Sequence, residues 1–189
     1  MNVFQSARFA AAVVVLSAVP LTAVQSGGQQ MPPMPKPGPE HEMLKMDEGT
    51  WDAIVEFSPG PGVPPMTSKG VEVNTLGCGG LCLISDFKGE AMGAPFQGHG
   101  VLTWDAAKKK YIGSWTDSMS MGLALTESTY DPAAKKWTGS MEGPDMTGKV
   151  MKMRSILEYT GTGTRVMTSF GPGPDGKEMQ MLKISYKKR

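Results

Sequence analysis

Alternation of apolar and polar residues dominates the chain from residue 51 onward. In 51–57 (WDAIVEF) every second side chain is apolar, a period typical of a strand with one buried face. Comparable short runs recur along the rest of the chain. They predict strands at 69–76, 81–88, 98–104, 110–117, 124–130, 136–141, 149–159, 164–170 and 178–187. Together these runs make about ten strands.

Turn signals separate the predicted strands. They include Gly79-Gly80, Asp105-Ala106, Asp131-Pro132, Gly143-Pro144 and Pro174-Asp175-Gly176. No long amphipathic helix stands between two runs, which excludes parallel crossovers and favours an antiparallel meander. A meander of this size normally closes into a barrel or folds into a sandwich, because closure removes exposed edges. The predicted fold class is therefore all-β.

One short helix is predicted before the strands. Residues 40–48 (EHEMLKMDE) follow Pro39, carry acidic residues in the first turn and end at Gly49. The segment 27–39 (GGQQMPPMPKPGP) is rich in glycine and proline and predicts an extended linker. We therefore expect the folded domain to occupy 40–189.

The first 26 residues have the order of a secretory signal peptide. Arg8 precedes an apolar run, Ala10–Val19, and Pro20 and small residues follow. The run is shorter than the ~20 residues that span a bilayer. A buried N-terminal helix is the alternative interpretation. The pattern predicts an exported protein, periplasmic or secreted, and leaves open where the signal is cleaved.

Charge limits the partners of the exported chain. The sequence has 189 residues, with 19 basic and 18 acidic side chains. Arg8 is the one charge in 1–26, so residues 27–189 hold 18 of each sign. A neutral chain lacks the basic footprint of a nucleic-acid-binding protein. We expect no nucleic acid and no membrane insertion after cleavage, and composition leaves the oligomeric state open.

Several motifs resemble a bacterial exported family of unknown function. They are Pro39-Glu40-His41-Glu42 with Gly49-Thr50-Trp51, then Pro95-Phe96-x-Gly98-x-Gly100, Lys110-Tyr111-x-Gly113-x-Trp115-x-Asp117, and Asp175-Gly176-Lys177-Glu178. The resemblance covers residues 39–189. It implies a lipocalin-like antiparallel β-barrel with a short N-terminal helix, in which the Gly-x-Trp strand closes one end. It supplies no activity.

Two cysteines flank a Gly-Gly turn and are not part of that resemblance. Cys78 and Cys82 are spaced C-x₃-C across a predicted hairpin. In an exported protein a disulfide is the expected state of such a pair, subject to geometry. Two free thiols, or a redox or metal pair, are the alternatives. No second cysteine pair or His-x-His motif completes a zinc site, so we expect no metal.

The sequence contains 16 methionines, and three pairs of them are spaced i, i+2. Residues two apart on a strand share a face, so each pair is expected on one face. An inward face would give an adaptable apolar pocket, because methionine repacks around varied ligands. Plain core filling and copper(I) binding are the alternatives. The pairs are Met119/Met121, Met151/Met153 and Met179/Met181.

Trp115 and Asp117 share one face of a predicted strand. An inward aspartate is costly unless it is paired, and Arg154 and Arg165 are the candidate partners. A ligand-orienting group at the barrel mouth is the functional interpretation, and an aspartate that caps the next turn is the alternative. His41 and His99 are the only imidazoles, and no G-x-S-x-G motif marks a nucleophile.

These features favour a binding module that holds a small apolar or amphipathic molecule inside the barrel without a cofactor. The expected ligand-binding residues are Trp115, Asp117, Met119, Met121, Met151, Met153 and Arg154. Two alternatives stay open: a hydrolase-like enzyme that uses a carboxylate in the cavity, and a filled barrel that acts through its surface. No catalytic residue is assigned.

Overall fold

The computed structural model describes residues 33–189, of which 35–189 form one compact unit. The predicted signal peptide and residues 27–32 of the predicted linker lie outside the described residues. Helix α1 (Pro39–Asp47) precedes the strands. These are β1 (Gly49–Phe57), β2 (Met66–Gly77), β3 (Cys82–Ala91), β4 (Ala94–Asp105), β5 (Lys110–Asp117), β6 (Ala124–Asp131), β7 (Lys136–Pro144), β8 (Val150–Gly161), β9 (Thr164–Pro172) and β10 (Glu178–Lys188).

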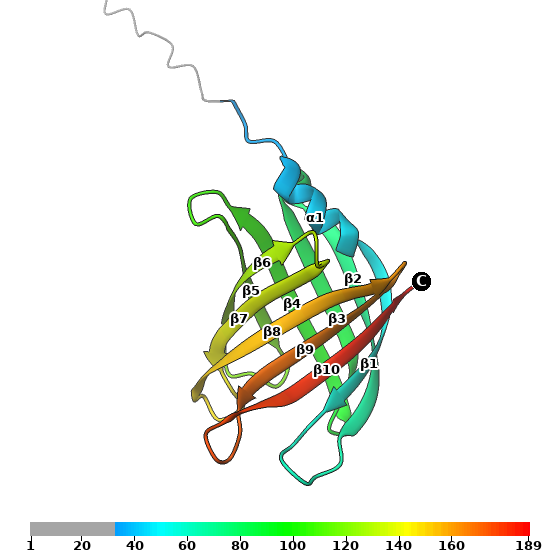
Figure 1. The fold of residues 1–189 in the computed structure, drawn as a ribbon, viewed down its shortest axis with the longest axis vertical. Helices are drawn as coiled ribbons and strands as arrows, with labels where there is room; N and C mark the ends of the chain where they lie inside the picture. Colours follow the sequence, from blue (N-terminus) through cyan, green and yellow to red (C-terminus); the bar gives the residue numbers. More distant parts are fainter. Residues whose placement is uncertain (1–32) are drawn as a thin grey trace, which may run out of the picture. The chain divides into compact units, whose positions relative to one another are not determined.

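The strands form a closed antiparallel barrel in chain order (Figure 1). Each strand pairs with its sequence neighbours, and β1 closes the barrel by pairing with β10 from Trp51↔Lys188 to Phe57↔Leu182. One irregularity interrupts the β9–β10 ladder between Gln180 and Leu182. The predicted fold class, the strands and the short helix are confirmed.

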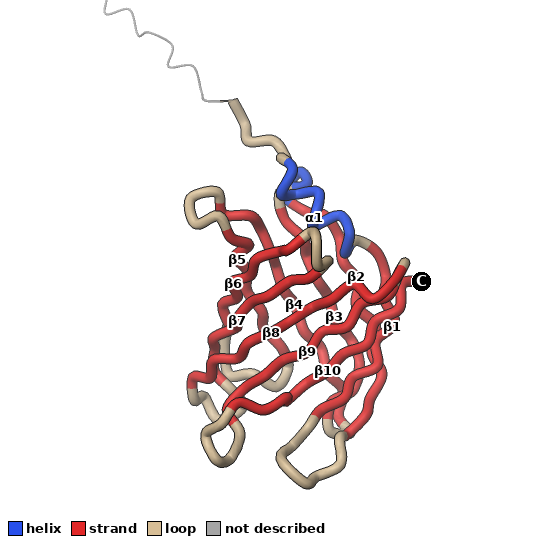
Figure 2. The backbone as a smooth tube through the Cα atoms, in the orientation of Figure 1, coloured by secondary structure: helices blue, strands red, loops and turns tan. Residues whose placement is uncertain are grey.

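The two ends of the barrel differ. We call the end covered by α1 the helix end; the turns after even-numbered strands and the C-terminus also lie there (Figures 1 and 2). The opposite end, the loop end, carries the connections that follow odd-numbered strands. These are 58–65, 92–93, 118–123, 145–149 and 173–177.

Aspartate side chains fix two hairpins at the helix end. Asp105 Oδ1 accepts hydrogen bonds from Ala107 N and Lys108 N at 2.9 and 3.0 Å. Two strands later, Asp131 Oδ1 accepts hydrogen bonds from Ala133 N and Ala134 N at 2.9 and 3.2 Å. The predicted turn signals at these positions therefore act through side-chain capping of the turn.

Helix α1 seals the helix end. Leu44 is fully buried in a cluster with Leu83, Tyr111 and Trp137. Tyr111 Oη donates to the Glu40 carbonyl at 2.8 Å, and Trp51 Nε1 donates to the Asp47 carbonyl at 2.9 Å. The helix is thus attached at both its ends to side chains that point into the barrel.

The predicted disulfide is wrong for this structure. Cys78 and Cys82 are free thiols, and their Sγ atoms lie 2.6 Å apart, beyond the ~2.05 Å of a disulfide bond. Cys78 is exposed and Cys82 is buried. Burial, with the neighbouring Cys78, raises the pKa of the Cys82 thiol to about 11.

Candidate ligand-binding site

A continuous row of small inward side chains crosses four strands midway along the barrel. Cross-strand partners point to the same face, and the row passes through Ser128, Gly139, Ser155 and Ser169 in direct register. It continues to Tyr111 on one side and Leu182 on the other, both of which point inward. No side chain in the row of four is larger than serine; Ser169 is buried, and the other three residues are half-buried.

Apolar side chains line the interior between this row and the loop end. Every residue of the lining is half-buried, and part of it packs against the buried side chains of Phe87 and Ile184. At the helix end Trp51 and Trp137 are buried, whereas Trp104, Tyr130 and Tyr159 are half-buried as well. The lining comprises Val55, Phe57, Phe96, Trp115, Met141, Met151, Met153, Met167, Met181 and Leu182.

Three methionines of the lining are neighbours. Met141 lies directly opposite Met153 in the β7–β8 ladder. A Cβ placed on Gly171 would stand 2.6 Å from Met181 Sδ and 3.5 Å from Met153 Cγ, so both side chains extend over that glycine. The absence of a side chain at Gly171 makes room for the thioethers.

Trp115 covers the opposite wall. A Cβ at Gly98 or at Gly100 would clash with the Trp115 indole, which places the ring flat over these two glycines of β4. Its Nε1 donates to Asp117 Oδ2 at 2.9 Å. The hydrogen bond to Asp117 therefore fixes the indole at the loop end, and the two glycines leave room for the ring to lie against β4.

Asp117 organises the loop that follows β5. Its carboxylate accepts hydrogen bonds from Trp115 Nε1, Met119 N and Ser120 Oγ, at 2.8–2.9 Å. The expected arginine partner is wrong, because Arg154 pairs with Glu178 and Arg165 pairs with Asp47 and Glu72. Met119 and Met121 lie in this loop instead of on a strand, and Met121 is 73% exposed.

Arg154 points away from the interior. It pairs in register with Ser140 and Phe170, the positions next to the inward Gly139 and Ser169. Its guanidinium makes a bidentate ion pair with Glu178, at 2.7 and 3.1 Å, and stacks over the Phe170 ring. The expectation that Arg154 contacts an internal ligand is therefore wrong, whereas Met151 and Met153 do face inward.

The two histidines lie away from the interior lining. His41 Nδ1 accepts a hydrogen bond from Gly38 N at the start of α1. His99 is exposed on β4, where its Nδ1 lies 2.8 Å from Asp86 Oδ1. Neither imidazole shares a site with Asp117. Within residues 33–189, no group of three or more His, Cys, Asp or Glu side chains is arranged to hold a metal ion.

A buried ionic cluster lies beneath α1. Arg165 pairs with Asp47 at 2.5 Å and with Glu72, while Tyr159 donates to Asp47 and Tyr186 donates to Glu72. Burial raises the pKa of Asp47 above its ordinary value, and Arg165 only partly offsets this. Burial also disfavours the charge of Arg165, but the two carboxylates raise its pKa. Each charged group of the cluster is paired within the protein, although Arg165 Nε has no hydrogen-bond partner among residues 33–189.

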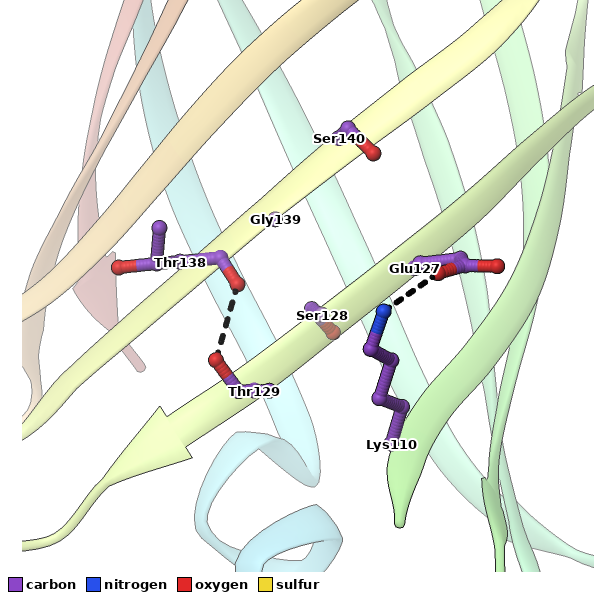
Figure 3. A pocket seen from close by; sticks show the side chains of 7 residues that line it. All are labelled: Lys110, Glu127, Ser128, Thr129, Thr138, Gly139 and Ser140. Atoms are coloured by element: carbon purple, nitrogen blue, oxygen red, sulfur yellow. Dashed lines mark hydrogen bonds and ion pairs between the residues drawn. The ribbon is translucent and has the colours of Figure 1, made fainter. Parts of the chain in front are cut away.

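Two depressions mark the outer surface. One of about 190 Å³ lies over β5–β7 and contains the Lys110–Glu127 ion pair and the Thr129 hydroxyl, which donates to the Thr138 carbonyl (Figure 3). The other, of about 550 Å³, lies over β1–β3, where Gly70 faces Gly89. Neither gathers perturbed acids or bases buried from solvent, so the interior remains the stronger candidate site.

Sequence reasoning missed part of the interior lining. Met141, Met167 and Phe96 belong to it, but none of them forms an i, i+2 methionine pair. The available signal was register, because Met141 stands opposite Met153 across a hairpin. A register-based assignment of β7 and β8 would have found it.

Comparisons with known proteins agree with this fold. Residues 36–188 match the model of a family described as "Protein of unknown function (DUF1579)". No curated protein matches the chain. An S-type phycobiliprotein lyase, CPES, from Guillardia theta is 11% identical, with a TM-score of 0.51 over 79% of this chain and 92% of that one. A redesigned beta barrel is 14% identical, with a TM-score of 0.42 over 78% and 95% of the two chains.

Proposed function

Because this chain belongs to the DUF1579 family, whose function is unknown, we propose from the site itself that the barrel binds a small apolar or amphipathic molecule. One observation carries the proposal. The inward side chains toward the loop end are large and apolar yet half-buried, and a row of serines and a glycine adjoins them. A half-buried apolar lining inside a barrel of this size suits a small ligand.

The lining indicates the character of the ligand. Methionine side chains adapt to irregular apolar shapes, and Trp115 offers a flat aromatic surface beside them. Asp117 already accepts three hydrogen bonds from the protein, so its carboxylate mainly holds Trp115 and the following loop in place. A polar head would instead lie toward the loop end and solvent. The likeness to a phycobiliprotein lyase concerns the fold alone.

A titration with oleate tests the proposal. We expect oleate to change the intrinsic tryptophan emission, and Trp115→Phe to remove most of that change. Ser155→Phe fills the interior row and should weaken binding at least about tenfold, which corresponds to about 1.4 kcal/mol. Ser185→Phe is the matched control, because Ser185 pairs with the exposed Ile54 on the outer face and should bind as wild type does.

The outcomes separate the hypotheses. Equal oleate affinity in wild type and Ser155→Phe would contradict an internal site. If Ser155→Phe does not fold, Met153→Gln tests the same wall with a side chain of similar size. Hydrolysis of an ester analogue of the fatty acid that depends on Asp117 would favour the alternative of an enzyme.

The proposal also includes export and the domain boundaries. The sequence pattern of 1–26 supports a cleaved signal peptide, followed by a linker at 27–39 and the barrel domain at 40–189. The exported protein would be periplasmic or secreted. N-terminal sequencing of the protein isolated from cells tests this, and an intact Met1 would contradict it. In 33–189, no helix is long and apolar enough to cross a membrane.

A further inference from the structure

Exposed apolar side chains are concentrated at the loop end. Eight of the twelve large exposed hydrophobic side chains in the described part of the chain lie on or beside its loops. Their exposed fractions run from 42% at Met66 to 73% at Met121. We call the eight residues the rim: Val63, Met66, Met92, Met121, Leu123, Leu125, Met146 and Val150.

The rim surrounds the end of the barrel toward which the apolar lining faces. Its members come from four of the five connections, after β1, β3, β5 and β7. The β5 connection is tied to the interior, because Asp117 bonds both Trp115 and the loop residues Met119 and Ser120. The loop that carries Met121 and Leu123 of the rim is therefore anchored to Trp115 of the lining.

Charge is balanced on these loops. Connections 58–65, 92–93 and 118–123 contain no charged residue. Connections 145–149 and 173–177 each hold one aspartate and one lysine. The loop surface therefore has no electrostatic preference for an anionic partner. Binding would come from the transfer of the apolar rim side chains into an apolar environment.

We propose that the rim docks on the surface of a lipid bilayer with uncharged headgroups, so that the ligand passes between bilayer and barrel. This rests on the proposed function for what is transferred. A bilayer is favoured over a protein partner because the apolar tips lie on separate loops. A protein would need matching hollows for each loop, whereas lipid conforms around all of them.

Position-specific quenching tests the proposal in the full chain. Leu123→Trp places a tryptophan on the rim, and Ile54→Trp places one on the outer face of β1, where Ile54 is 49% exposed against 56% for Leu123. With vesicles of brominated phosphatidylcholine, we expect the emission added by Leu123→Trp to be quenched and that added by Ile54→Trp to persist. Because each added signal comes from one position, lipid contact elsewhere in the chain does not affect the comparison.

Further arms determine the nature of the contact. Adding Met121→Asp to Leu123→Trp should weaken the response to vesicles at least about tenfold, since a rim side chain becomes charged. Adding phosphatidylglycerol or salt should change little. Equal quenching at both positions, or no quenching at either, would overturn the proposal. It would also be overturned if the introduced rim tryptophan became buried without lipid as the protein concentration rises. Oleate binding measured on the same samples separates the outcomes, because intact oleate binding without quenching overturns docking alone.

Discussion

At the scale of single residues, Arg165 holds the most consequential position. Its side chain is 3% exposed, and it lies between two aromatic rings, 4.2 Å from the Trp51 centroid and 4.5 Å from that of Tyr186. It is the cation that faces both Asp47 and Glu72. Without it, two carboxylates would remain buried with only hydroxyl and amide donors.

Replacing Arg165 by methionine should therefore destabilise the fold by about 3–5 kcal/mol, the range for breaking a buried ion pair. Chemical denaturation followed by tryptophan emission measures this. Arg154→Met is the matched control, because Arg154 makes an ion pair on the solvated surface and its loss should change stability little. Arg165→Lys should not restore stability, since lysine lacks the planar group that stacks between the rings. Similar losses for Arg165→Met and Arg154→Met would contradict this account.

At the scale of elements, α1 is held to the barrel by polar contacts at its last residue. Asp47 offers its carbonyl to Trp51 Nε1 and Asn74 Nδ2, and its carboxylate to Arg165 and Tyr159. Because burial raises the pKa of this carboxyl, its ionised form is disfavoured in the folded state relative to the unfolded chain.

This shift has a definite sign. A raised folded-state pKa gives a contribution to stability that is complete below the ordinary value near 3.8 and is lost as pH rises through the folded pKa. The free energy of unfolding of wild type minus that of Asp47→Asn should therefore fall with rising pH, by at most about 1.4 kcal/mol per unit. Denaturation curves between about pH 3 and pH 8 measure it.

Asp52 provides the opposite control for that experiment. Its hydrogen bond with Arg189 lowers its pKa, so its contribution is lost as pH falls. The free energy of unfolding of wild type minus that of Asp52→Asn should therefore rise with rising pH, whereas the corresponding difference for Asp47→Asn falls. The same direction for both variants would mean that burial does not dominate at Asp47.

The elements themselves were predictable because their signals are local. Alternation places Trp51 and Ala53 on one face within a single strand, and turn residues such as Asp105 delimit each hairpin. Met119 and Met121 were misplaced for the same reason. Their spacing has the period of a strand, but Asp117 accepts the Met119 N–H and ends β5 before them.

At the scale of the whole molecule, the family resemblance predicted an asymmetry in which one end is closed, but the contacts that close that end were not predictable. They join residues far apart in the chain, such as Tyr159 Oη with Asp47 Oδ1 and Arg165 with Glu72. No single segment carries that information. The outward position of Arg154 is a similar case, because a two-residue period is clear within β8 but its inward phase is fixed only by pairing with β7 and β9.

The same asymmetry predicts where a ligand changes backbone protection. Binding that excludes water from the loop-end interior should slow amide exchange there, since a bound ligand stabilises the states that hold it. Hydrogen–deuterium exchange with and without oleate should show added protection in 118–123, in β8 near Met153 and in β10 near Met181. Amides of α1 and of the hairpin at Asp131 should be unchanged, because the packed helix end separates them from the ligand. The control variant Ser185→Phe should reproduce the wild-type exchange pattern. Added protection centred on α1 would place the ligand beneath the helix and contradict the proposed site.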